Sequence, residues 1–451
     1  MNNIKQFFSD GLSENLIIAL SQFDGLQVIG RNSAFQFRDS RDNSATIGRK
    51  LGVAHLLEGS VQHAGNAVRI SVELISATTG RTLWSQRYDR PYKDLFRLQD
   101  EITNAVAGAL KARLLKPGSA VVQSDRPPSG NLQAYNAYLQ GNFYVERSTD
   151  VDYRKAIDAY ADAIRLDPRY ALAWARLSLA WSNVGAYFLG GADQQSAYSH
   201  ARAAAERALV LAPDLAAADV ARGTLLSVDF DLPGAEVAFR RALQLAPNDD
   251  TAMDSLGTML AMHGDLEQAI VLMRQALQID PLNAGWHARL STYLKGLGRF
   301  DEAEHEIGKA IELEPTGQIY HSVLTQLEIQ RGDPKAALAA AWQEPAGVWR
   351  IVALAFARQV VNDRAAADAA LQNLVDTFGG QAAYQIAQVY ALRRDADKTF
   401  EWLDRAWTNR DPGVNLLLYD PFILRYQDDP RFAAFCRQVG LPVTTTAKAM
   451  P

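Results

Sequence analysis

The sequence predicts an α+β domain at its amino-terminal end, followed by an all-α, right-handed solenoid of helix pairs. Two observations predict this fold class. Before residue 90, apolar and polar residues alternate strictly over one run, and such alternation indicates a half-buried strand. After residue 200, proline, glycine and alanine recur every 34 residues. A fixed period of about 20 to 50 residues indicates stacked repeats that share one continuous core.

The recurring residues have separate physical roles. Small alanines let two antiparallel helices approach closely, a glycine opens the turn between them, and a proline stops the second helix. A period of 34 residues is the helix–turn–helix period of the tetratricopeptide repeat. The residues that keep this period are Pro213, Pro247, Pro281 and Pro315, then Gly264, Gly298 and Gly332, then Ala235, Ala269, Ala303 and Ala337, and finally Ala242, Ala276 and Ala310.

The amino-terminal domain is expected to place helices over a mainly antiparallel sheet. Val68, Ile70, Val72 and Leu74 alternate with polar residues and predict a strand with one buried face. The expected elements are, in order, a helix over 7–23, a strand over 26–29, a helix over 44–51, strands over 56–61, 68–74 and 81–88, and a helix over 93–114.

Three stretches between about residues 7 and 115 resemble the TolB amino-terminal-domain-like module of bacterial regulators: FSDGLSENLIIALSQFDGLQVIGRNSAF, IGRKLGVAHLLEGSVQHAGNAVRISVELISATTGRTLWSQRYDR and DLFRLQDEITNAVAGAL. In such proteins the module precedes tetratricopeptide arrays, and it often follows a nucleotide-cyclase, winged-helix DNA-binding or kinase domain. Relatives usually carry an apolar strand ahead of the Phe-Ser-Asp-Gly-Leu motif. The resemblance therefore implies that the first strand is missing and that the chain is a piece of a longer protein.

Four segments are expected along the chain. They are the α+β domain (1–116), a linker rich in Pro, Ser and Gly (117–130), the solenoid (131–441) and a tail (442–451). The solenoid is expected to hold about six clear repeats and then degenerate helical pairs, because terminal repeats are commonly atypical. Pro213 follows Pro168 by 45 residues, so the second repeat carries an 11-residue insertion, placed in VGAYFLGGADQQ.

Composition excludes several classes of function. The net charge is −5 and no basic cluster is present, so we expect no nucleic-acid partner for this chain. No apolar run is long enough to span a bilayer, and no signal peptide is visible. A single cysteine, Cys436, excludes an internal disulfide framework. The expected location is the cytoplasm, or the periplasm if the chain is a fragment of a membrane-anchored protein, and the oligomeric state is left open.

No catalytic, cofactor-binding or metal-binding residue is predicted. The seven histidines include no His-x-x-x-His pair, and the adjacent residues of Glu304-His305-Glu306 would point in different directions on a helix. Gly308-Lys309 lies in the middle of an expected helix, without the strand and glycines that a phosphate-binding loop needs. No Gly-x-Ser-x-Gly motif is present. We therefore expect a protein that is not an enzyme.

The groove is the favoured binding site. In tetratricopeptide arrays the first helix of each repeat lines the groove, and here its positions are small, neutral and able to form hydrogen bonds. The cluster of Lys, Arg and Asn that grips a carboxyl terminus in some arrays is absent, so we expect an extended or helical peptide as ligand. The predicted groove residues are Thr251, Asp254, Thr258, Met262, Ala288, Thr292, Lys295, Ser322, Gln326 and Gln330, after Leu172, Asn183, Val220 and Thr224 in earlier repeats.

These observations predict a non-catalytic scaffold or regulatory segment that binds a protein or peptide through the groove. Three alternatives stay open. The chain could be an accessory segment of a larger signalling protein, such as a nucleotide cyclase or a transcriptional regulator. It could be a small-molecule sensor, with the ligand beside the first repeat or in the insertion of the second. It could also be an envelope component exposed to the periplasm.

Overall fold

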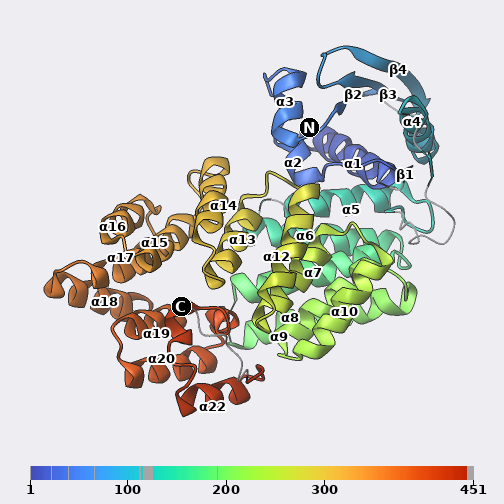
Figure 1. Ribbon diagram of the computed structural model, residues 1–451. Helices are drawn as coiled ribbons and strands as arrows, with labels where there is room; N and C mark the ends of the chain where they lie inside the picture. Colours follow the sequence, from blue (N-terminus) through green and yellow to red (C-terminus); the bar gives the residue numbers. More distant parts are fainter. Residues whose placement is uncertain are drawn as a thin grey trace. The chain divides into compact units, whose positions relative to one another are not determined.

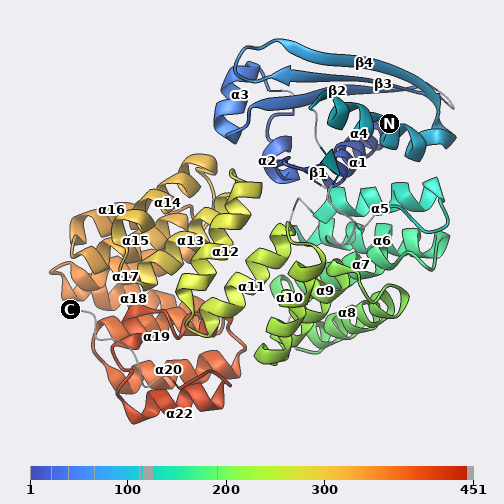
Figure 2. The ribbon, with the colours of Figure 1, turned by 45° about the vertical axis from the view of Figure 1, so that its right-hand side comes forward.

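The computed structural model describes residues 2–21, 23–38, 40–64, 67–110, 113–114, 125–145, 147, 149–189 and 191–443. Residues 117–124 of the predicted linker and 444–451 of the predicted tail lie outside the described residues. The chain forms two compact units (Figure 1 and Figure 2). Unit 1 comprises Met1–Ala252 and Gln278–Leu282, and unit 2 comprises Met253–Leu277 and Asn283–Pro451.

The amino-terminal part of unit 1 is the predicted α+β domain. Strands β2, β3 and β4 form a three-stranded antiparallel sheet in that order, while β1 pairs with β5. The elements are α1 (Asn2–Leu20), β1 (Phe23–Asp24), α2 (Arg31–Phe35), α3 (Ser44–Leu51), β2 (His55–Ala64), β3 (Ala67–Ser76), β4 (Thr82–Pro91), a 3₁₀ turn η1 (Tyr92–Asp94), α4 (Leu95–Ala109) and β5 (Arg113–Leu114).

The strand expected over 26–29 is wrong. The chain has no strand there, and the short strand β1 lies just before it. Gly25 adopts a left-handed φ of +80°, and the Leu26 amide donates back to the Phe23 carbonyl at 3.2 Å. The backbone therefore turns directly after β1, and the apolar residues that follow are not paired in a ladder.

One face of the sheet belongs to the core. The side chains of Val68, Ile70 and Val72 on β3 are almost fully buried, whereas the residues between them are exposed or half-buried. Leu95, Leu98 and Ile102 of α4 join the same apolar cluster. The alternating pattern of β3 thus directs its apolar residues toward the helices, as the sequence predicts.

The rest of the chain is an all-α array of antiparallel helix pairs, so the predicted fold class is confirmed. In unit 1 the helices are α5 (Leu132–Val145), α6 (Asp150–Leu166), α7 (Ala171–Tyr187), α8 (Gly191–Leu211), α9 (Ala216–Val228) and α10 (Leu232–Leu245). The next two, α11 (Asp250–Met262) and α12 (Leu266–Ile279), lie mainly in unit 2.

The remaining helices belong to unit 2. They are α13 (Ala284–Gly296), α14 (Phe300–Leu313), α15 (Tyr320–Arg331), α16 (Pro334–Gln343), α17 (Val348–Val360), α18 (Arg364–Phe378), α19 (Ala383–Leu392), α20 (Ala396–Thr408), a 3₁₀ helix η2 (Pro412–Leu416), α21 (Pro421–Leu424) and α22 (Pro430–Gln438). Helix α22 is the last of these helices along the chain.

The recurring residues act as expected. Gly264, Gly298 and Gly332 follow the first helices with φ between +72° and +84°, a conformation that other residues adopt only at a cost. Two residues after Gly332 the next helix begins, and the Asp333 carboxylate caps it by accepting the Ala336 amide. Ala235, Ala269, Ala303 and Ala337 are all fully buried, as close packing of the two helices requires.

The insertion in the second repeat lengthens its helices. Helix α7 has 17 residues against 13 in α9, and α8 has 21 against 14 in α10. These differences together account for the 11 extra residues. The Gly-rich stretch is therefore absorbed mostly into helix, with residues 188 and 189 following the end of α7.

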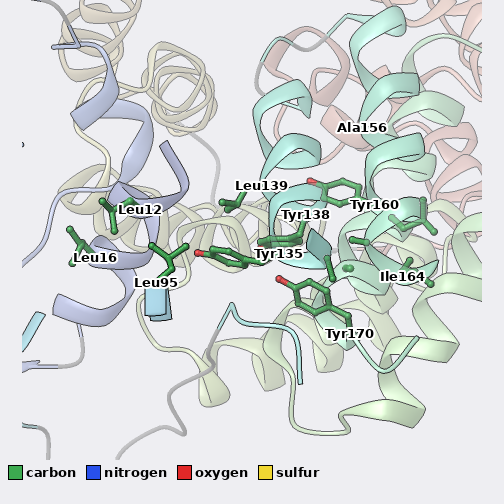
Figure 3. Packing of buried hydrophobic residues seen from close by; sticks show 14 of the residues in the cluster. Leu12, Leu16, Leu95, Tyr135, Tyr138, Leu139, Ala156, Tyr160, Ile164 and Tyr170 are labelled. Carbon is green, nitrogen blue, oxygen red and sulfur yellow. The ribbon is translucent and has the colours of Figure 1, made fainter. Parts of the chain in front are cut away.

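The core of unit 1 is continuous from the α+β domain into the first repeats. Leu12, Leu16 and Leu95 belong to the same buried cluster as the tyrosines of the repeats (Figure 3). These tyrosines come from α5, α6 and the residue before α7, and they are almost fully buried: Tyr135, Tyr138, Tyr160 and Tyr170. The α+β domain and the first helix pairs thus fold around one shared core.

The described end of the predicted linker is part of this core. Asp125 is 2% exposed, and its carboxylate accepts hydrogen bonds from Asn15 Nδ2 at 2.7 Å and from the Tyr135 hydroxyl at 2.8 Å. The Tyr170 hydroxyl donates to the Asp125 carbonyl. The domain boundaries drawn from the sequence remain predictions, with residues 125–130 packed against both neighbouring segments.

Candidate peptide-binding groove

The predicted groove residues come mainly from three consecutive first helices, α11, α13 and α15. Thr251 is exposed and falls in unit 1, while the other nine lie in unit 2. Asp254, Thr258, Thr292, Gln326 and Gln330 are half-buried. The structure therefore brings nine of the ten residues into one unit, and it leaves about half of them partly accessible.

Arg289 joins α13 to α11 on this face. Its guanidinium lies 3.3 Å from the Asp254 carboxylate and donates to the Thr258 hydroxyl at 2.5 Å. Burial raises the pKa of Asp254, and the charge of Arg289 opposes that rise. Sequence reasoning missed Arg289. It follows the predicted groove residue Ala288 directly, and its long side chain reaches back across the repeat.

Lys295 makes the equivalent link from α13 to α15. Its ammonium group donates to Gln326 Oε1 at 2.7 Å, and the side chain is 5% exposed. Burial lowers the pKa of Lys295 to about 8, although the nearby Asp420 carboxylate favours the charged form. A lysine so poorly solvated needs an anion or strong acceptors around it, which makes it the most distinctive predicted residue of this face.

The other predicted residues are less prominent. The Thr292 hydroxyl donates to the Ala288 carbonyl of its own helix at 3.0 Å. Met262, Ala288 and Ser322 are buried, so they contribute packing more than accessible surface. Ser322 Oγ and Gln330 Nε2 are buried atoms for which the described residues provide no hydrogen-bond partner. Such atoms are rare in folded proteins, and a bound water or ligand atom would satisfy them.

A segment of the chain itself lies on this face. Residues 411–424, here called the inner segment, follow the last helix pair and comprise η2, a turn and α21. The ring of Tyr419 packs edge-on against that of Tyr293 on α13, with centroids 5.7 Å apart. A β-carbon on Gly296 of α13 would lie 3.2 Å from the β-carbon of Tyr419. Glycine therefore allows the inner segment to approach α13 closely.

Polar contacts at Asp411 and Asp420 fix the inner segment to α19. The Asp420 carboxylate accepts hydrogen bonds from the Tyr384 hydroxyl at 2.9 Å and from Gln388 Nε2 at 2.6 Å. Burial raises the pKa of Asp420, and the charge of Lys295 opposes that rise. The Asp411 carboxylate accepts the Tyr384 amide at 2.9 Å. Two aspartates thus fasten the segment to the same tyrosine.

Aromatic packing completes the attachment. The ring of Phe422 lies 5.5 Å from that of Phe356 on α17, and Phe422 is 2% exposed. Sequence reasoning missed the inner segment. The sequence feature that could have revealed this segment is the apolar run Val414-Asn-Leu-Leu-Leu-Tyr-Asp-Pro-Phe-Ile-Leu424. Because this run lies outside the 34-residue period, its apolar side chains have to be buried against helices of the repeats.

The histidines do not assemble a metal site among the described residues, where no group of three or more His, Cys, Asp or Glu side chains could hold an ion. Of the Glu304-His305-Glu306 stretch, Glu306 contacts a different histidine, with its carboxylate 2.5 Å from His287 Nδ1. That contact joins α13 to α14. It supports the helix pair and leaves no convergent ligand set.

Comparisons with known proteins bear on the repeats. The family model of the tetratricopeptide repeat matches residues 260–327, which include α13 and its polar link to α15. Residues 260–327 are tetratricopeptide repeats. The match coincides with the stretch in which the 34-residue period is strict, and the helix pairs on either side continue the same pattern of buried alanine.

One curated relative shares part of the sequence. It is "Putative adenylate cyclase 3" of Rhizobium meliloti (strain 1021), 34% identical over 175 residues. The matched stretch is 38% of this chain and 29% of the relative's length.

Solved tetratricopeptide-like structures are similar at lower identity. The crystal structure of MamA has a TM-score of 0.29 at 22% identity, over 39% of this chain and 94% of that one. Yeast Tom70 has a TM-score of 0.42 at 16% identity, over 72% of this chain and 70% of that one. With TM-scores below 0.5, these likenesses do not bear on what the chain binds. Among the described residues, no helix is long and apolar enough to cross a membrane.

Proposed function

We propose that this chain is a non-catalytic interaction scaffold, and that the inner face of α11, α13 and α15 binds a peptide segment of a partner protein. One observation carries the proposal. Successive first helices are joined by side chains about one repeat apart, Arg289 to Thr258 and Lys295 to Gln326, which form a continuous polar face. Repeat arrays present such faces to extended ligands.

The unsatisfied groups on this face support the proposal. Ser322 Oγ and Gln330 Nε2 are buried without a hydrogen-bond partner among the described residues. Each such group costs about 1–3 kcal/mol unless something satisfies it. A peptide backbone laid along the first helices offers both donors and acceptors at regular spacing, and so it suits a row of hydroxyl and amide groups.

Site-specific photo-crosslinking tests the proposal. A photoreactive amino acid at Thr292, on the inner face of α13, should crosslink one partner in a lysate of source cells. The same amino acid at Val271, a 48% exposed residue of α12, is the matched control. Excess unlabelled chain should compete for the Thr292 product. Equal crosslinking from both positions, or from neither, would remove the inner face as the binding site.

A second function is favoured by the curated relative. We propose that the chain is the accessory part of a larger signalling protein, in which the TolB-like module and the repeats sense or recruit a partner for a separate effector domain. The partial match to a protein named as an adenylate cyclase supports this, since it spans 29% of that protein. The purified chain should convert no ATP to cyclic AMP with Mg²⁺ or Mn²⁺. Metal-dependent conversion would contradict both proposals.

A further inference from the structure

The inner segment indicates which peptide the groove of unit 2 accepts. Its residues do not continue the 34-residue period, and its backbone is a 3₁₀ helix, a turn and one short helical turn. Even so, Leu417, Tyr419, Asp420 and Phe422 are all at most 5% exposed. The segment is therefore held by the first helices in the way that an arrayed groove holds a bound peptide.

Three neighbouring subsites receive three consecutive chemical groups. An aromatic subsite, formed by Tyr293 and the flat surface at Gly296, receives the ring of Tyr419. A carboxylate subsite, with donors from Tyr384 and Gln388, receives Asp420. A second aromatic subsite, at Phe356, receives Phe422. The intervening Pro421 begins α21.

The carboxylate subsite selects for a hydrogen-bond acceptor. Burial raises the pKa of Asp420, and the charge of Lys295, buried nearby on α13, opposes that rise. An apolar side chain at this place would leave the Tyr384 hydroxyl and Gln388 without their acceptor, and would remove the carboxylate near Lys295. A buried site with charged and polar donors rejects ligands that lack the matching acceptor, because the donors are then left unsatisfied.

We propose that this groove recognises an aromatic–Asp–Pro–aromatic sequence, that Tyr419–Phe422 is its resident ligand, and that a partner carrying the same sequence exchanges with it. The inference rests on the proposed function. It adds the sequence that the partner carries and the statement that the chain's own Tyr419–Phe422 occupies the groove before the partner binds. The resident ligand competes at the high effective concentration of a tethered segment. Partner binding therefore requires release of residues 411–424 from α13, α17 and α19.

A labelled peptide tests the exchange. The probe is a fluorescein-labelled peptide of residues 411–425 (DPGVNLLLYDPFILR), added to the full-length chain. A chain with Tyr419→Ala and Asp420→Ala should bind it at least tenfold more tightly than the unmodified chain, because the two subsites are vacated. A peptide with its Asp420 replaced by Ala should bind that variant at least tenfold more weakly. Equal binding of the two peptides would overturn the proposal.

A reversible crosslink provides a second test if the double variant does not fold. The ideal β-carbon at Gly264 lies 3.9 Å from the β-carbon of Leu418, within the range that a disulfide spans. In a chain with Gly264→Cys and Leu418→Cys, the oxidised form should not bind the peptide, and the reduced form should bind it at high peptide concentration. Failure of the reduced form and of a folded double variant to bind would show that the segment is a fixed part of the core.

The outcome is separable from that of the proposed function. If the peptide fails to bind but Thr292 still crosslinks a partner and Val271 does not, then the groove binds another sequence and only the present inference fails. If Thr292 crosslinks nothing while the peptide binds, then the groove recognises the sequence of Tyr419–Phe422. In that case it binds only the chain's own segment, and the proposed function fails.

Discussion

The two units fasten a non-repeat segment to their helices by the same device. In unit 1, Asp125 before α5 accepts the hydroxyl of Tyr135; in unit 2, Asp420 before α21 accepts the hydroxyl of Tyr384. Both carboxylates are at most 4% exposed. Burial raises the pKa of each.

The surroundings of the two carboxylates differ. Asp420 lies in the field of Lys295, which is itself buried. The cation next to Asp125 is Arg126, which is partly exposed and pairs with Asp100 at 2.6 Å. Burial raises the pKa of both carboxylates, to about 6 for Asp125, and at Asp420 the charge of Lys295 opposes that rise. The comparison teaches that the same hydrogen-bonding device can be buried beside a buried cation in one place and beside a partly exposed one in the other.

Removal of Asp420 should have the largest effect. The change Asp420→Ala leaves the Tyr384 hydroxyl and Gln388 without their acceptor in a buried site and removes the carboxylate near Lys295, so we expect a loss of about 3 kcal/mol in the unfolding free energy of unit 2. Chemical denaturation with hydrogen exchange of the α19 amides measures it. Asp404→Ala, at an exposed position of α20, is the control and should change stability by less than about 0.5 kcal/mol. Similar losses from both variants would show that Asp420 is not an anchor.

Asp125 should make the stability of unit 1 depend on pH. Its folded pKa of about 6 lies above the ordinary aspartate pKa of 3.8, so the protonated form is favoured by folding. This contribution is complete below about pH 4 and is lost as the pH rises through 6, for a total of about 3 kcal/mol. The variant Asp125→Asn keeps an acceptor and does not titrate. The stability of the unmodified chain relative to this variant should fall by about that amount between pH 4 and pH 7.

Urea denaturation of both proteins at a series of pH values measures this difference. Asp158→Asn, at an exposed position of α6, is the matched control, and its curve should run parallel to that of the unmodified chain. Parallel curves for Asp125→Asn as well would mean that Asp125 is ionised in the folded protein throughout this range.

The repeats were predictable because their constraints are local and periodic. Gly264 allows the left-handed turn, Ala269 allows close contact between the helices, and Pro281 ends the second helix. All the signals of one repeat therefore fall within 34 residues. The same reasoning proposed ten groove residues, and nine of them fall in one unit. It did not find Arg289, because a long side chain can cross to another helix without any periodic signal.

The structures of the inner segment and of residues 26–29 could not be predicted from local sequence patterns. The residues around Tyr419 contact helices more than 100 residues earlier in the chain, and nothing in their own spacing specifies those partners. The run Leu26–Ile29 has the composition of a strand, yet the turn at Gly25 and the pairing of Phe23 with Leu114 decide the local structure. Tertiary contacts, which the local spacing does not specify, decide the structure of both stretches.

Close packing between paired helices gives a third, smaller expected effect. A β-carbon on Gly141 of α5 would lie 2.4 Å from the ring of Tyr160 on α6, so Gly141→Ala must displace a fully buried tyrosine. We expect a loss of about 1–3 kcal/mol in unit 1. Gly223→Ala, with 2.6 Å to the ring of Phe239 on α10, should behave alike. Thermal unfolding measures both, and an unchanged transition would mean that the two helices separate at little cost.

A glycine-to-alanine substitution should instead raise the stability where no neighbouring atom is close to the new β-carbon. Gly308 lies within α14, and a β-carbon there would meet nothing within 4 Å. Glycine inside a helix costs roughly 0.5–1 kcal/mol relative to alanine because it loses more backbone freedom on folding. Gly308→Ala should therefore stabilise unit 2 by that amount, a rise of about 2 °C in its thermal transition. A fall instead would show that helix propensity does not decide the stability of unit 2 at this position, since propensity alone favours alanine.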